Sequence, residues 1–320
     1  MSTPHDDQTS AHTLLPTPRQ ALSIAARGFG MGVAEVIPGV SGSTIALILG
    51  VYTRFVEAIK AYTPRSVIAF LLALPGAKRD RATFIARSRD LHLEFMLPLM
   101  AGMATAVLIA SKVLPPLMRT YPAHADAVFF GLILGSVWLP WSMIPKKSPV
   151  LLVPVVVAVI AAWFLVGHPT MTAGEASPAY IFFCACVAIC AFILPGVSGS
   201  YTLKVLGQYE NVLGAIHRLD FVVLIAFGLG MVVGLALFVR VLSFLLTRFP
   251  SVTLAALTGL MAGSLRSVWP FKQEAGVVAS GYFPTSFAAH ELTVIAAFAF
   301  GALLVVGVGA LDRRSRSGEK

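Results

Sequence analysis

Six long apolar runs constrain this chain more than any other feature of its sequence. Each is long enough, or nearly so, to cross about 30 Å of hydrocarbon as a helix. They lie at about 92–115, 123–142, 149–167, 219–247, 252–268 and 288–311. Of the 320 residues, 57% are hydrophobic and only 12% are charged, against about 25% charged in a soluble domain. The sequence therefore predicts an all-α, polytopic helical membrane protein. It disfavours a soluble enzyme, and also a nucleic-acid-binding protein despite the net charge of +9.

Two further apolar stretches, 21–60 and 179–217, are each interrupted by Pro-Gly-Val-Ser-Gly-Ser. The segment 38–59 matches 195–216 without a gap, and Gly131–Ser136 matches Gly259–Ser264 at a smaller offset. Three full spans lie between the two motifs, so the two halves are expected to face opposite ways. Inverted repeats with broken helices are typical of transporters, and the breaks mark the binding site. We predict two inverted repeats, each with a broken or re-entrant helical hairpin and about three transmembrane helices; a duplication without a transport role is the weaker alternative.

The distribution of Lys and Arg orients the chain in the membrane. These residues are concentrated between the first hairpin and the first full span and again at the C-terminus, but none lies in 168–178. Because cytoplasmic loops carry the excess of Lys and Arg, both termini are expected to be cytoplasmic. The expected order is a disordered cytoplasmic tail, repeat 1 with a basic cytoplasmic insert, an outside linker, repeat 2 and a cytoplasmic tail. These segments are 1–20, 21–167 (insert 61–90), 168–178, 179–311 and 312–320.

The interrupting motif has the chemistry of an anion site. Pro38-Gly39 and Pro195-Gly196 end the helices before them. The residues that follow begin new helices, which brings backbone N–H groups, hydroxyls and the positive end of a helix dipole together. The expected contacts to a phosphate or carboxylate are Ser41, Gly42, Ser43 and Thr44 in the first copy, and Ser198, Gly199, Ser200 and Tyr201 in the second. One copy alone would be typical of a plain turn, but two near-identical copies within apolar stretches indicate a site.

Three charged side chains lie near the motifs. Glu35 precedes Pro38 by three residues, and burial there favours the neutral form of a carboxylate. Glu35 is therefore a candidate proton carrier for coupling, or alternatively an acceptor for the start of the next helix. Arg27, about 12 Å earlier along a helix, either holds a lipid phosphate or snorkels to the interface. Lys204 could neutralise phosphate, although Leu47 occupies its position in the first copy. The histidines lack metal-ligand spacing, so we expect no metal and no cofactor.

These motifs resemble a bacterial and archaeal membrane family, formerly a domain of unknown function, that is tied to polyprenyl-phosphate translocation. The resemblance covers about residues 20–310, and it is carried by 32–44 with Gly50 and Tyr52, 131–136, 194–200 with Gly207 and Tyr209, and 259–264. It implies a transporter, not an enzyme, that returns undecaprenyl phosphate across the bacterial cytoplasmic membrane for recycling of the lipid carrier. It also implies that the motif residues contact the substrate. The chain departs from the usual pattern at Ser43, where the family has glycine, and at Lys204.

Two other functions stay open from the residues alone. The same site could serve a transporter of a small soluble anion, whose path would be closed to lipid. A membrane enzyme acting on polyprenyl phosphates would need a nucleophile with a base, or metal-binding carboxylates, and neither serine motif has such neighbours. A lipid transporter needs a cleft open to the bilayer, and Gly228, Gly230 and Gly234 are expected to permit close helix packing beside it. The oligomeric state, coupling ion and preferred tail length remain open.

Overall fold

A computed structural model describes residues 16–36, 40–74, 80–167, 176–272, 281–282 and 289–317. The regular secondary structure in these ranges is helical, apart from an isolated bridge between Lys272 and Gly281. Six of the described helices are long and apolar enough to cross a membrane. They are α6 (Leu93–Thr120), α7 (Pro122–Ser142), Pro149–Gly167 with α8 (Leu152–Gly167), α12 (Phe221–Arg248), Pro250–Val268 with α13 (Pro250–Ser264), and Ala289–Gly307 of α14 (Ala289–Ser317). They coincide with the six apolar runs, so the prediction of a multi-pass helical membrane protein is confirmed.

Each interrupted stretch forms three helices. The first contains α1 (Pro18–Glu35), α2 (Gly42–Ile48) and α3 (Tyr52–Ala61), and the second contains α9 (Pro178–Ile193), α10 (Gly199–Val205) and α11 (Tyr209–Arg218). Gly50 and Gly207 have φ of 68° and 71°. Glycine adopts such a left-handed conformation without strain, which explains why both copies have it before the third helix. The expected breaks Pro38 and Gly39 lie outside the described residues.

Helices extend into both expected tails. Thr17 and Gln20 form a capping box, which satisfies free N–H groups at a helix start, so α1 begins within the expected N-terminal tail. At the other end α14 continues to Ser317, inside the expected C-terminal tail. The parts of the tails and of the outside linker at 1–15, 168–175 and 318–320 lie outside the described residues.

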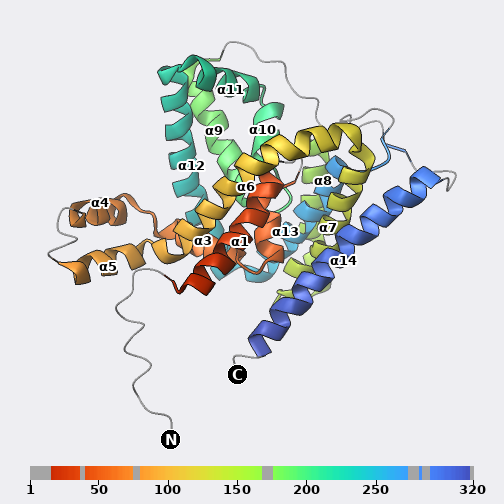
Figure 1. Cartoon of the computed structure of the whole chain (residues 1–320), viewed down its shortest axis with the longest axis horizontal. Helices are drawn as coiled ribbons and strands as arrows, with labels where there is room; N and C mark the ends of the chain where they lie inside the picture. The colour runs from red at the N-terminus through yellow and green to blue at the C-terminus, as the bar shows by residue number, and fades with distance from the viewer. Residues whose placement is uncertain are drawn as a thin grey trace, which may run out of the picture.

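The spans pack in a pattern that crosses between the halves of the chain. α1 packs on α6 and α9 packs on α12, but α7 packs on α14 and α8 packs on α13. Figure 1 shows α7, α8, α13 and α14 together on the right, with α9 to α12 at the upper left. The third span of each half therefore packs against the second span of the other half.

Glycines allow these close approaches. A Cβ on Gly102 would clash with the carbonyl oxygen of Ala25, and one on Gly230 with that of Phe182. Gly131 faces the Phe298 carbonyl and Gly259 the Val155 carbonyl in the same way. Gly234 also packs closely, against Cys186. The expectation for Gly228 was wrong, because a Cβ at this position would meet nothing within 4 Å; Gly228 is exposed on α12.

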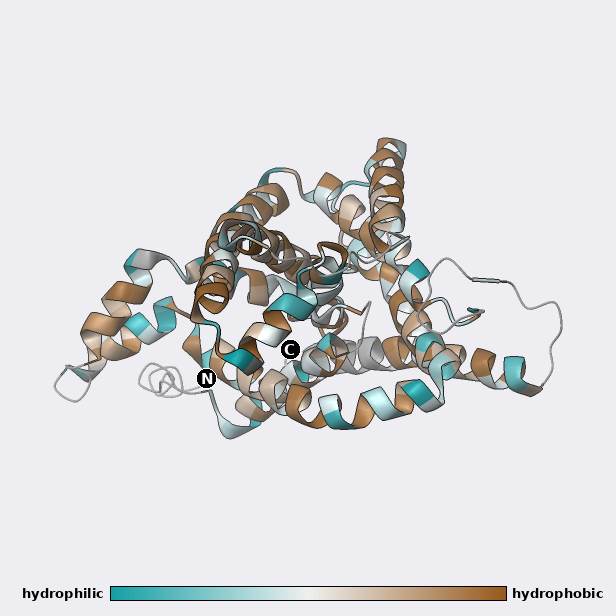
Figure 2. Ribbon diagram, turned by 90° about the horizontal axis from the view of Figure 1, so that it is seen from above, coloured by the Kyte–Doolittle hydropathy of each residue, from teal (hydrophilic) through white to brown (hydrophobic). Residues whose placement is uncertain are grey.

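The outward faces of the spans are apolar, and so is the interior of the protein. Phe164 and Val232 are each 64% exposed, and Figure 2 shows brown, hydrophobic residues on most sides of the long helices. The largest fully buried side chains include Phe95, Met31 and Leu99. A helix that is hydrophobic all round is typical of a membrane span, so these outer faces fit a lipid surrounding.

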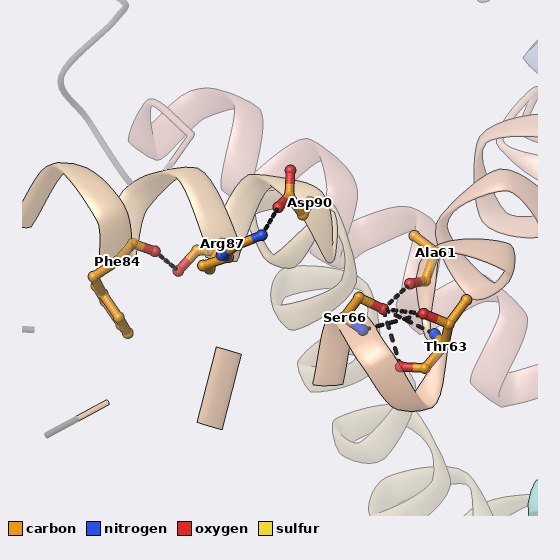
Figure 3. A network of polar contacts seen from close by, with 7 residues as sticks. Ala61, Thr63, Ser66, Phe84, Arg87 and Asp90 are labelled. Carbon is orange, nitrogen blue, oxygen red and sulfur yellow. Dashed lines mark hydrogen bonds and ion pairs between the residues drawn. The ribbon is translucent and has the colours of Figure 1, made fainter. Parts of the chain in front are cut away.

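The basic insert folds into α4 (Pro64–Ala73) and α5 (Arg81–Asp90), which lie side by side at the left of Figure 1. The rings of Phe70 and Phe84 stack at 5.6 Å between their centroids. Figure 3 shows the capping box of Thr63 and Ser66 that starts α4. The sequence predicted a basic cytoplasmic insert here; the structure forms two helices from it, and the side of the membrane on which they lie stays a prediction.

Candidate functional site

The two interrupting motifs, 157 positions apart in the sequence, meet in the core of the protein. The backbone N–H of Gly196 donates a hydrogen bond to Thr44 Oγ1 at 2.8 Å. The hydroxyl of Ser41 donates to the Leu194 carbonyl at 3.4 Å. Ser41 and Thr44 are essentially unexposed. The two motifs therefore lie at one place in the structure.

The close approach of the second motif requires glycine at position 196. Gly196 has a φ of 86°, and a Cβ there would lie 2.7 Å from the Cα of Met261 on α13. Pro195, which precedes it, is buried. A side chain at 196 would be strained by its backbone conformation and would also push α13 away.

The polar groups of the first motif are occupied by one another. The Oγ atoms of Ser41 and Ser43 lie 2.6 Å apart, within hydrogen-bonding distance. The N–H of Gly42, the first residue of α2, donates to Glu35 Oε1 at 2.6 Å. Both serines are buried. Glu35 thus accepts from the start of the next helix, which is one of its two interpretations. Residues 41–44 are all buried and have no accessible face.

The second motif is more open. Ser198 accepts from the N–H of Tyr201 at 3.4 Å, and its Oγ lies 3.0 Å from that of Ser200. Ser200 is only partly buried, whereas Gly199 beside it is buried. The hydroxyl of Tyr201 donates to the Val166 carbonyl near the end of α8. Through this bond Tyr201 links α10 to α8.

A cavity of about 310 Å³ lies beside the second motif, among α9, α10, α11 and α12. Glu35 and Ser200 line it together, so both halves of the chain contribute polar groups. Most of the remaining wall is apolar, with Phe192, Phe227 and Met231 among its residues. This arrangement suits a ligand with a small polar head and an apolar tail.

The two predicted cationic contacts, Lys204 and Arg27, make no hydrogen bond to the serines in the described part of the chain. The ammonium group of Lys204 lies 4.7 Å from the centroid of the Tyr209 ring, a cation–π contact, and Tyr209 lines the cavity. Arg27 is half-buried on α1, with no ion pair or hydrogen bond within the described part of the chain. Lys204 thus contacts a residue of the cavity wall without lining the cavity itself, and Arg27 is not among the lining residues either.

Sequence reasoning missed a second, polar cavity of about 520 Å³ at the turn between α6 and α7. Lys272 Nζ donates to Asp126 Oδ2 at 2.8 Å, and both side chains are largely buried. His124 and His290 lie in the same wall. These residues are dispersed along the sequence, and no motif marked them.

Six candidate spans, two interrupted stretches that meet in the core and a cavity beside the second stretch define a multi-pass helical membrane protein. The family model described as undecaprenyl phosphate translocase-like matches residues 31–286, and the chain belongs to this family. This confirms the resemblance that the paired motifs indicated and the expectation of a transporter rather than an enzyme.

Two curated relatives share one name with each other, polyprenyl-phosphate transporter. A polyprenyl-phosphate transporter of Vibrio cholerae is 37% identical over 254 residues, which cover 79% of this chain and 79% of the relative. A polyprenyl-phosphate transporter of Staphylococcus aureus is 30% identical over 263 residues, which cover 76% of this chain and 84% of the relative. No solved structure matches the chain.

Proposed function

We propose that this protein carries undecaprenyl phosphate, or a related polyprenyl phosphate, from the outer to the cytoplasmic leaflet of a bacterial cytoplasmic membrane. Family membership and the two named relatives support the substrate class. The cavity shared by Glu35 and Ser200 is the observation that carries the proposal. Its polar groups match a phosphate head, and its apolar wall matches the first isoprene units.

The apolar wall also favours a lipid over a small soluble anion. If the ligand were a soluble anion, Phe192, Phe227 and Met231 would face water or the ion, and no free energy would come from burying their apolar surface. A polyprenyl tail buries the same surface, which is worth about 25 cal/mol for each Å² removed from water. Leu213 and Ile216 of α11, which also line the cavity, are 40% and 53% exposed. The tail can therefore leave the cavity beside α11 and remain in the bilayer.

Glu35 links the proposed binding to a proton. An ionised carboxylate at the cavity would repel a phosphate anion, whereas a protonated one can donate its O–H to phosphate and still accept from the Gly42 N–H with its other oxygen. The anion and a proton then enter together, and the transfer moves less net charge across the membrane. A pH gradient, acid outside, would favour inward transfer.

The proposed topology consists of two inverted repeats with both termini in the cytoplasm. The matched contacts support the repeat: Ala25 and Phe182 differ by 157 positions, and the glycines that they meet, Gly102 and Gly230, differ by 128. In Figure 1, α11 lies at the upper edge, whereas α1 begins and α14 ends toward the lower side. The two hairpins would then enter the membrane from opposite faces.

The test uses purified protein in liposomes that contain fluorescent undecaprenyl phosphate, with head-group exposure followed from outside. The protein should accelerate transfer. Ser200→Ala should slow it by roughly 10- to 150-fold, because a hydrogen bond to a charged group is worth about 1.5–3 kcal/mol. The matched control is Ser142→Ala, since Ser142 is exposed and bonds only the Leu139 carbonyl of its own helix. Folded protein that does not accelerate transfer refutes the function, and equal rates for both variants refute the role of Ser200.

A further inference from the structure

The two halves of the protein have the same pattern of residues around the cavity but differ in packing. Residues of α1–α3 correspond to those of α9–α11 that lie 157 positions later, and residues of α6 correspond to those of α12 that lie 128 later. Twelve of the thirteen cavity residues come from the second half. Their counterparts in α1, α2, α3 and α6 are all buried except Glu35, the counterpart of Phe192. The corresponding space in the first half is therefore filled by its own side chains.

Identical residues show the difference most directly. Ile216 on α11 lines the cavity and is 53% exposed, whereas its counterpart Ile59 on α3 is 9% exposed. The helix contacts explain this. α3 packs against α12, whereas α11 has no comparable packing against α6 among the described residues. The first hairpin is thus closed against the opposite half, and the second stands open.

The space in the first half is closed by a particular side chain. Met31 on α1 is 1% exposed and belongs to the main hydrophobic core. Its counterpart Ala188 lines the cavity, where the shorter side chain leaves room. Leu99 of α6 is likewise unexposed, while its counterpart Phe227 forms part of the cavity wall.

A polar group remains unsatisfied in the closed space. The hydroxyl of Tyr52 is buried and has no hydrogen-bond partner among the described residues, and Tyr52 as a whole is 4% exposed. Its counterpart Tyr209 lines the open cavity. Buried hydroxyls are almost always paired, so an unpaired one marks a place where a ligand can supply the partner. Ser43, the counterpart of Ser200, adds a second hydroxyl on the same half.

We propose that the first half contains a second, collapsed site for the polyprenyl phosphate, between α1, α2, α3 and α6, which opens when the cavity of the second half closes. The proposal rests on the proposed function, because the ligand is the same lipid phosphate. Tyr52 and Ser43 would hold the phosphate in the open form, and displacement of Met31 would admit the first isoprene units. The structure is then one of two alternate forms, with the second-half cavity open and the first-half site closed.

The test compares the rate at which N-ethylmaleimide labels Ile59→Cys and Ile216→Cys in liposomes. Both are placed in a variant with Cys184, Cys186 and Cys190 replaced by alanine, which must itself transport. Without substrate, the thiol at position 216 should react rapidly and the thiol at position 59 slowly. Undecaprenyl phosphate, supplied during turnover, should raise the labelling rate at position 59 by about tenfold or more, as expected when a form populated at about 0.1–10% becomes a major one.

Exchanging the two filling residues tests the same equilibrium without substrate. Met31→Ala with Ala188→Met empties the first space and fills the second, so labelling at position 59 should become faster and labelling at position 216 slower. If the double variant does not fold, Ala188→Met alone is tested. It should likewise make labelling at position 59 faster and labelling at position 216 slower. If the cysteine-free protein transports but the thiol at position 59 stays unreactive during turnover, the second site is refuted while the function stands. If the protein does not transport at all, the proposed function fails first.

Discussion

The hydrogen bond between Thr44 and Gly196 fastens the two hairpins to each other, and its removal should destabilise the protein measurably. Thr44→Val keeps the shape of the side chain and removes the hydroxyl that accepts from the Gly196 N–H at 2.8 Å. Both groups are buried, so the N–H would be left without a partner. An unsatisfied buried donor costs about 1–3 kcal/mol, and we expect the free energy of unfolding to fall by that amount.

Thr202→Val provides the matched control. Thr202 is also buried, but its hydroxyl donates to the Ser198 carbonyl within its own helix, and that carbonyl accepts the Thr202 amide as well. Its loss leaves no orphaned group, so the change should be smaller than for Thr44→Val and not exceed the about 0.5–1.5 kcal/mol of an ordinary hydrogen bond. Unfolding would be followed by circular dichroism during SDS titration of protein in mixed micelles. Equal destabilisation by the two valines would refute the idea that the link between the hairpins carries stability.

Three further results are expected. Gly230→Ala should reduce stability and the yield of folded protein because its Cβ would meet the Phe182 carbonyl, whereas Gly228→Ala, with open space around it, should be tolerated in thermal-unfolding and yield measurements; equal loss would contradict the packing of α9 on α12. Glu35→Gln should keep the fold but lose the dependence of initial transport rate on an imposed pH gradient, and an unchanged gradient response would remove Glu35 as the proton carrier. A single cysteine at Ala176 should react with an impermeant maleimide from outside and one at Arg81 only from inside, and labelling of both from one side would end the inverted-repeat interpretation.

The spans and the breaks could be predicted because each depends on local sequence. A span needs an apolar run of sufficient length, and a break needs proline or glycine in such a run. The hydrogen bond that joins Thr44 to Gly196 could not be predicted, since it depends on how two distant segments approach.

The accessibility of the site could not be predicted from the motifs. Ser43 and Ser200 occupy the same position in identical hexapeptides, yet Ser43 is 2% exposed and Ser200 lines the cavity. The difference comes from the side chains around them, such as Met31 in one half and Ala188 in the other. Tyr52 and Tyr209 were noted in the repeat without a role, although a tyrosine kept in both copies beside a helix break was the available signal for a wall of the site.

The crossed packing of α7 on α14 and of α8 on α13 sets the order in which the protein can assemble during synthesis. The glycine face of α7 at Gly131 meets Phe298, which the ribosome adds 167 residues later. At a synthesis rate of about 5–20 residues per second, Phe298 is added roughly 8–33 s after Gly131. During that interval the small-residue face of α7 lies against lipid or a temporary helix. The first half therefore cannot complete its own packing, and a chain interrupted before α14 would leave α7 as an unfinished surface in the membrane.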